Sequence, residues 1–182
     1  MMKKNNRTPL HNRNIFLKGF LRDDNLYDIE AELIDTKHYS IPNKDRGNIV
    51  AGDPIHNMKI KITLDKNLTI KDALAVTLNG PFDVCKNANK NFSKIIGIQI
   101  KPGWKKKLLG LIGNINGCTH VTELLSPIAT TAYQTIKGHE AKVNRERKNN
   151  LNAKKPSLLG TCHAFNPRGK IVKRLWPEWH QK

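Results

Sequence analysis

Five side chains of the sequence could bind a metal ion or attack an electrophile. They lie in three segments of the chain and are Cys85, Cys118, His120, Cys162 and His163. Thiolate sulfur and imidazole nitrogen are ligands that zinc prefers, and thiolates also hold iron–sulfur clusters. The spacing includes no CxxC pair, so a second interpretation stays open, in which the cysteines are small buried apolar side chains.

The helices expected around these residues place two of the cysteines at helix N-termini. Apolar residues recur at helical spacing over 84–96, so Cys85 would lie in the first turn of a helix. A continuous apolar face over 121–136 puts Cys118 and His120 at the beginning of the longest expected helix. Free backbone N–H groups and the helix dipole favour a thiolate at such positions.

Upstream of Asp83, apolar and polar residues alternate as they do in antiparallel sheets with one buried face. The alternation predicts a strand over 26–35 and an antiparallel hairpin over 57–79. A less regular strand is expected over 14–22. The buried face of the hairpin's second strand would carry four apolar residues: Ile70, Leu74, Val76 and Leu78.

The expected fold class is therefore α+β, an antiparallel three- to four-stranded sheet packed by helices, with an added C-terminal hairpin. The core domain would span 15–136, preceded by a basic tail at 1–14 and followed by a basic connector at 137–155. The hairpin is expected over 156–176, packing on the core, because "NPRG" at 166–169 is a common turn sequence.

Composition narrows the classes of protein to consider. The longest apolar stretch, "LLGLIG", is far shorter than the roughly 20 residues that a membrane span needs, and no apolar stretch follows the basic N-terminus as in a secretory signal. A cytoplasmic location is expected, where the three cysteines would be free thiols or ligands. An odd number of cysteines agrees with this.

The formal net charge of +17 raises the possibility of nucleic-acid binding. Acidic residues are concentrated over 23–35, whereas the cations are spread along the rest of the chain. The basic stretch at 137–155 contains no aromatic residue to stack on bases. Any nucleic-acid binding is therefore expected to be weak and non-specific, and a protein partner stays open.

Long segments of the chain resemble an uncharacterised bacterial family, a domain of unknown function. The segments are "RDDNLYDIEAELIDTK", "AGDPIHNMKI", "GCTHVTELLSPIATTAYQTI" and "TCHAF", and the resemblance runs over residues 11–176. This resemblance implies no established activity.

More distantly, the order of elements resembles that of NifU/IscU-type iron–sulfur scaffold domains. In those scaffolds a ligand loop leads into a strand, as "DPIHNMKI" does here, and a hairpin then delivers a cysteine to a helix start, as at Cys85. The resemblance implies a NifU/IscU-like fold in which ligands converge at one end of the sheet. Other scaffold ligands fall on Pro54, Leu124 and Leu125 in this chain, so cluster assembly is not implied.

Three functions follow as hypotheses. The first is a metal- or iron–sulfur-binding accessory protein that uses the five Cys and His residues, with His56 as a reserve ligand and zinc or a cluster as the cofactor. The second is a cysteine-dependent enzyme or sulfur carrier, in which His120 or His163 would be the base for Cys118. The third is a basic binding module without chemistry.

Overall fold

The computed structural model describes residues 6–146 and 155–182 of the chain. Contacts divide the chain into two compact units, Met1–His139 and Glu140–Lys182. The first unit contains a four-stranded antiparallel sheet and most of the helices, so the expected α+β class is confirmed.

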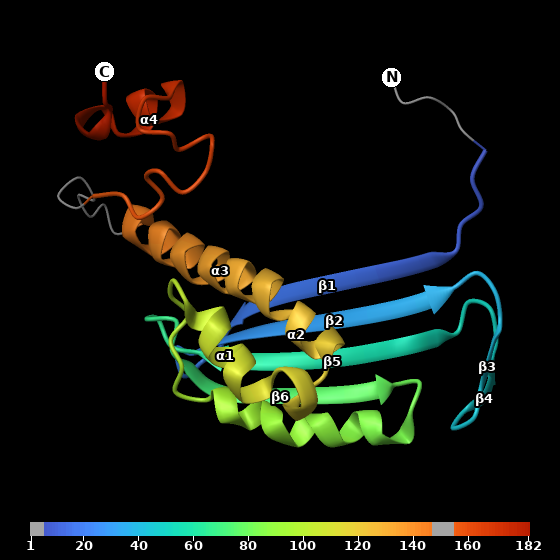
Figure 1. Cartoon of the computed structure of the whole chain (residues 1–182). Coiled ribbons are helices and arrows are strands. Elements are labelled where there is room, and N and C mark those ends of the chain that lie inside the picture. Colours follow the sequence, from blue (N-terminus) through green and yellow to red (C-terminus); the bar gives the residue numbers. More distant parts are fainter. Residues whose placement is uncertain (1–5, 147–154) are drawn as a thin grey trace. The chain divides into compact units, whose positions relative to one another are not determined.

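The sheet consists of β1 (His11–Leu21), β2 (Tyr27–Lys37), β5 (Pro54–Leu64) and β6 (Ile70–Asn79), in this spatial order (Figure 1). Every neighbouring pair is antiparallel, which confirms the predicted hairpin and the strand that joins it. The first strand begins three residues earlier than expected, inside the predicted basic tail, because β1 pairs with β2 along its whole length.

The segment between β2 and β5 contains a small two-stranded sheet of its own. Its strands are β3 (Ile41–Asn43) and β4 (Gly47–Ile49). Gly47 has a φ of 74°, in the left-handed region that glycine adopts without strain, so the turn between the two strands closes there.

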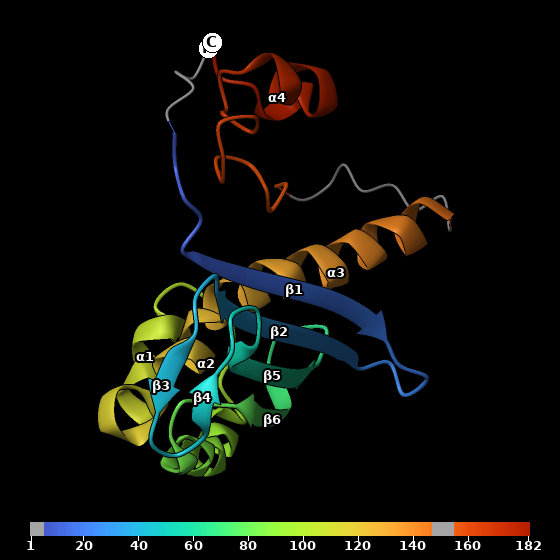
Figure 2. The same ribbon diagram turned by 90° about the vertical axis from the view of Figure 1, so that its right-hand side faces the viewer.

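The helices of the first unit lie on one face of the four-stranded sheet (Figures 1 and 2). In chain order they are η1 (Asp83–Ile95), α1 (Trp104–Ile112), η2 (Asn114–Asn116), α2 (Thr119–Glu123) and α3 (Leu125–Glu146), of which the part from Glu140 onward belongs to the second unit. The core between sheet and helices includes the fully buried Ile29, Leu33 and Ile62 from strands and Leu108 and Ile128 from helices. Burial of these apolar side chains is the main force that holds the helices on the sheet.

The predicted buried face of β6 was wrong for three of its four residues. Ile70 is buried, but Leu74, Val76 and Leu78 are exposed, and Ala73, Ala75 and Thr77 face the core instead. The register explains the error, because Leu64 pairs with Ile70 whereas Thr63 pairs with Asp72. The extra residue on β6 forms a bulge that reverses which side chains point inward.

Helix α3 lies close against β1 at Gly19. A Cβ atom at this position would overlap the side chain of Thr135, with the Thr135 Cβ only 2.9 Å away. Farther along the helix, the hydroxyl of Tyr27 lies 2.9 Å from Nδ1 of His139. The glycine in the first strand therefore leaves the space that the side chain of Thr135 occupies.

The second unit contains α4 (Lys170–Leu175) and η3 (Pro177–Trp179). The expected C-terminal hairpin over 156–176 was wrong, because residues 155–182 form turns and short helices without a strand. The "NPRG" turn is present, with the Gly169 N–H bonded to the Asn166 carbonyl oxygen at 2.7 Å, but it leads into α4. Packing of this segment on the core stays a prediction.

The predicted connector at 137–155 is helical over its first part, because α3 continues to Glu146. Its remainder, 147–154, lies outside the described residues. Over 6–146 and 155–182, none of the helices combines the length and the apolar character that crossing a membrane requires.

Candidate metal centre

A polar row crosses the inward face of the sheet next to the apolar core. Arg13 on β1 pairs with Asp35 on β2, and Asp35 pairs with His56 on β5. Side chains two residues apart on a strand share a face, and these residues continue the inward-facing positions of Leu33 and Met58. The same alternation that builds the core therefore carries three polar side chains to its edge.

Asp35 is the centre of this row and is 1% exposed. Arg13 donates two hydrogen bonds to it, from Nε to Oδ1 and from Nη2 to Oδ2, both at 2.7 Å. Nδ1 of His56 lies 3.1 Å from Oδ2, and Nε2 of His11 lies 3.4 Å from Oδ1. A buried carboxylate needs such partners to offset its lost hydration.

Burial acts to raise the pKa of the Asp35 carboxyl. The hydrogen bonds and charge of Arg13, with contributions from His56 and His11, outweigh burial and hold that pKa below its ordinary value of 3.8. Asp35 is therefore an ionised carboxylate at neutral pH, which is the form that binds cations.

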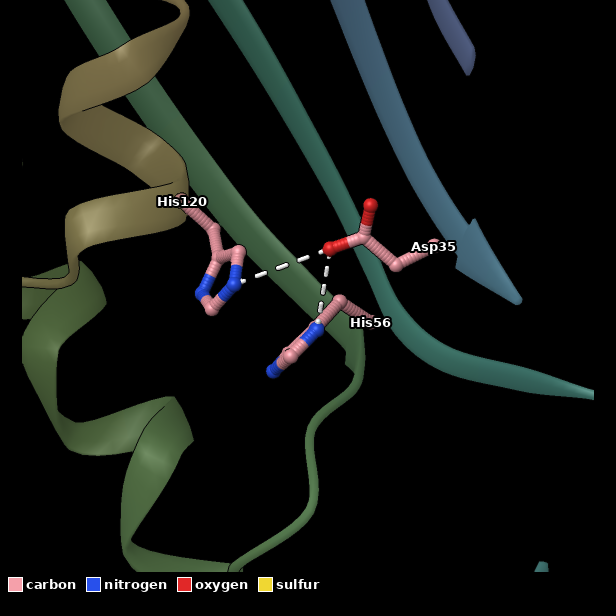
Figure 3. Close-up of side chains that lie close together, drawn as sticks. All are labelled: Asp35, His56 and His120. Atoms are coloured by element: carbon pink, nitrogen blue, oxygen red, sulfur yellow. Dashed lines mark hydrogen bonds and ion pairs between the residues drawn. The ribbon is translucent and has the colours of Figure 1, made fainter. Parts of the chain in front are cut away.

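His120 reaches the same carboxylate from helix α2 (Figure 3). Its Nε2 lies 3.6 Å from Oδ2 of Asp35, and its ring stacks on His56 with centroids 3.6 Å apart. Its other nitrogen, Nδ1, lies 3.7 Å from Sγ of Cys118, the residue that caps α2. One ligand atom from each of Asp35, His56 and His120 can be chosen so that all three lie within 4.8 Å of one another.

Both histidines of the cluster are shifted toward their neutral form. Burial lowers the pKa of His56 below its ordinary value of 6.5, and His120 lowers it further against the opposing effect of Asp35. Burial is also the main cause of the lowered pKa of His120, which Asp35 again opposes. Neutral imidazole has a free lone pair, so both rings are in the state that a metal ligand requires.

These shifts predict that acid destabilises the metal-free protein. The unfolded chain takes up protons on His56 and His120 near pH 6.5, before the folded chain does, so the free energy of unfolding falls as pH drops from about 7 to about 5. Four other charged groups act on the two rings or on their partners: Asp35, Arg13, His11 and the exposed Glu123. Urea unfolding in EDTA across this pH range measures how steeply the free energy of unfolding changes with pH.

The control for this prediction is a histidine outside the cluster. The double variant His56→Gln/His120→Gln should flatten the dependence on pH, whereas His38→Gln, at an exposed position, should keep the wild-type slope. If the free energy of unfolding of the double variant still falls with pH as steeply as that of the wild type, groups other than the two histidines cause the pH dependence.

The structure brings together three of the six residues that the sequence analysis named as ligands or reserve ligand: His56, Cys118 and His120. Cys85 is half-buried in η1, beside Gly80, whose added Cβ would meet the Cys85 side chain. Cys162 and His163 are exposed and belong to the second unit. A coordination sphere shared by all three cysteines stays a prediction.

Sequence reasoning missed Asp35, Arg13 and His11. A signal for Asp35 was present, because it occupies the next inward position after Tyr27, Ile29, Ala31 and Leu33 on a strand whose other acids point outward. An acid on the buried face of a strand requires a partner. His11 and Arg13 were assigned to a tail, which hid their pairing with β2.

Comparison with protein-family models gives one match, over residues 11–134, to the family described as "Protein of unknown function (DUF2889)". The match covers about two-thirds of the chain and includes Asp35, His56, Cys118 and His120, whereas Cys162 and His163 lie beyond it. No curated protein and no solved structure matches the chain. The comparisons therefore support the uncharacterised family but not the resemblance to NifU/IscU-type scaffolds.

Proposed function

Since the chain belongs to the DUF2889 family of proteins of unknown function, we propose its function from the site itself: it binds a divalent transition metal, zinc above all, through Asp35, His56 and His120. The observation that carries this proposal is the convergence of a buried carboxylate and two imidazoles within 4.8 Å. Each group is shifted toward the protonation state that coordinates a metal.

The distances from the carboxylate oxygen to the two ring nitrogens are close to those expected for tetrahedral zinc. Bonds of about 2.0–2.1 Å at tetrahedral angles place neighbouring ligand atoms about 3.3 Å apart. The nitrogens of His56 and His120 lie 3.1 and 3.6 Å from Oδ2 of Asp35. A metal would bind the nitrogen of each neutral ring that faces the carboxylate, with the ring proton on the other nitrogen. Binding would weaken in acid, because protons then compete with the metal for the imidazole lone pairs.

Arg13 acts on this site in two opposing ways. Its two hydrogen bonds fix the orientation of the Asp35 carboxylate, as partners of ligating carboxylates commonly do. Its positive charge also repels a cation. The three ligands together carry one negative charge, that of the Asp35 carboxylate, because both histidines are neutral. The proposal therefore rests on how the stacked rings and the carboxylate converge and not on accumulated negative charge.

Cys118 supports the site from outside the three ligands. Its sulfur lies next to the His120 nitrogen that does not face Asp35, so it can accept a hydrogen bond from that nitrogen and hold the ring. A thiolate-held iron–sulfur cluster would need several cysteines. Such a cluster, or a zinc site that includes Cys85, Cys162 and His163, would use residues outside the group formed by Asp35, His56 and His120.

Metal content tests the proposal directly. Protein purified without chelator should contain about one zinc equivalent, and His56→Gln or His120→Gln should lower zinc affinity by more than about 100-fold, since loss of a mere supporting contact already costs 10–100-fold. Elemental analysis and calorimetric titration with zinc measure both quantities. His38→Gln, at an exposed position, is the matched control and should bind as the wild type does.

Cysteine variants separate the three-ligand site from the wider one. Cys118→Ser should weaken binding by about 10–100-fold through the orientation of His120, and Cys85→Ser and Cys162→Ser should leave affinity unchanged. Metal loss in either of the last two variants would favour the wider cysteine site. Wild-type protein that takes up no zinc would refute both.

A second candidate function is a cysteine nucleophile, and one arrangement favours it. The thiol of Cys118, the ring of His120 and the carboxylate of Asp35 form a line in which each ring nitrogen faces one partner, at 3.7 and 3.6 Å. A nucleophile, a base and an orienting acid are arranged in this order in cysteine enzymes. Alkylation of Cys118 in EDTA that slows sharply in His120→Gln would support this function; an unchanged rate would leave the metal site.

A further inference from the structure

The outer face of the four-stranded sheet is left uncovered by the described helices of the first unit, which lie on the opposite face (Figures 1 and 2). Its central part forms two rows across the strands, in which the residues pair in register. The first row is Phe16, Glu32, Lys59 and Val76, and the second is Lys18, Glu30, Lys61 and Leu74.

On the two central strands, the charges of these rows are arranged oppositely on either side of the sheet's midline. Both acids, Glu30 and Glu32, are on β2, and both of their neighbours on β5, Lys61 and Lys59, are bases. The midline of the sheet runs between β2 and β5. The acids of β2 and the bases of β5 are therefore related by a reflection across this line, whereas Lys18 on β1 has the apolar Leu74 on β6 as its counterpart.

A two-fold axis along the midline makes this face complementary to itself. Such an axis places β2 of one copy over β5 of the other, so that Glu30 and Glu32 lie over Lys61 and Lys59 of the second copy. Two antiparallel sheets commonly pack face to face with their strands nearly aligned, and a two-fold interface must match its own surface in this way. Like charges would meet if the axis ran across the strands instead.

The first row also has an apolar residue at each edge, and these two residues obey the same symmetry. Phe16 on β1 is 56% exposed, and Leu74 and Val76 on β6 are 53% and 37% exposed. The same axis lays Phe16 over Val76 of the second copy and Lys18 over its Leu74, where the lysine's apolar stem can cover the leucine. Between these edges lies a shallow hollow of about 440 Å³ lined by the residues of both rows, and the axis lays it over the same hollow of the second copy.

We propose that the outer face, defined as these two rows, is a homodimer interface with its two-fold axis parallel to the strands. The interface is independent of the metal centre, which lies on the opposite face of the sheet. The apolar edges supply buried area, and the crossed Glu–Lys pairs set the orientation of the copies.

Charge exchange between two variants tests this geometry. Glu30→Lys/Glu32→Lys makes both halves of the face basic, and Lys59→Glu/Lys61→Glu makes both halves acidic. Wild-type protein should have twice the 20.7 kDa mass of one chain, and each variant alone should be monomeric. An equimolar mixture of the two variants should recover the dimer, because every acid then faces a base across the axis. Light scattering after size-exclusion chromatography, repeated over a dilution series, measures the masses.

Two measurements keep the test decisive. Asp23→Lys/Glu178→Lys changes net charge by the same amount as the first variant at exposed positions and should remain dimeric, and urea unfolding verifies that each variant is folded. A monomeric wild type, whether its outer face is open or covered by another segment of the same chain, would overturn the proposal. Variants that stay dimeric, or a mixture that fails to associate, would also overturn it.

Discussion

Replacing Asp35 by asparagine is expected to lower the free energy of unfolding of the metal-free protein by about 3 kcal/mol, the lower end of the range for breaking a buried ion pair. The amide would lose the charge that Arg13 requires and would turn an N–H group toward one of its two donors. The lower end applies because the Arg13 side chain is 37% exposed and can be partly rehydrated. Zinc binding should be lost in the same variant.

A double-mutant cycle and a matched surface pair isolate this effect. Adding Arg13→Gln to Asp35→Asn should recover part of the stability, because the uncompensated charge is then removed. Asp24 makes the same two-pronged contact with Arg22, but both side chains are solvated, so Asp24→Asn should change stability much less. Equal losses in the two asparagine variants would show that burial of Asp35 is not the cause. Urea unfolding followed by circular dichroism gives the free energies of unfolding of these variants and of Arg13→Gln alone, which completes the cycle.

Replacing Gly117 by alanine is expected to destabilise the protein by at least about 1–3 kcal/mol, the usual range for overpacking. The added Cβ would lie 2.7 Å from the carbonyl carbon of Ile112 and would overlap its oxygen. Both are backbone atoms of the end of α1, so no side-chain rotation relieves the contact. Because Gly117 precedes Cys118 and α2, the displacement should also move His120 and weaken zinc binding.

Gly110 is the control, because it lies on α1 and a Cβ there would meet nothing within 4 Å. Gly110→Ala should stabilise the protein by about 0.5–1 kcal/mol, since alanine is the better helix former. Thermal unfolding of the two variants, with zinc titration of each, measures both effects. Unchanged zinc affinity in a destabilised Gly117→Ala variant would show that the position of α2 does not control His120.

The strands were predictable because alternation is a local property. In an extended backbone successive side chains point to opposite faces, so a run such as 26–35 defines its own buried side without reference to the rest of the chain. The same reasoning failed on β6, where one extra residue between the pairs Leu64–Ile70 and Thr63–Asp72 reverses the buried side. A bulge depends on hydrogen bonds with the neighbouring strand, and alternation does not report it.

For the candidate site, too, one part was predictable from the sequence and another part was not. The sequence by itself determined the pair Cys118 and His120, because two residues at one helix start are close in any fold that forms the helix. Only the tertiary structure decided that Asp35 and His56 join them. Those residues are brought together by the register of β2 with β5, and register arises from the collective pairing and burial of whole strands, which no single segment of the sequence contains.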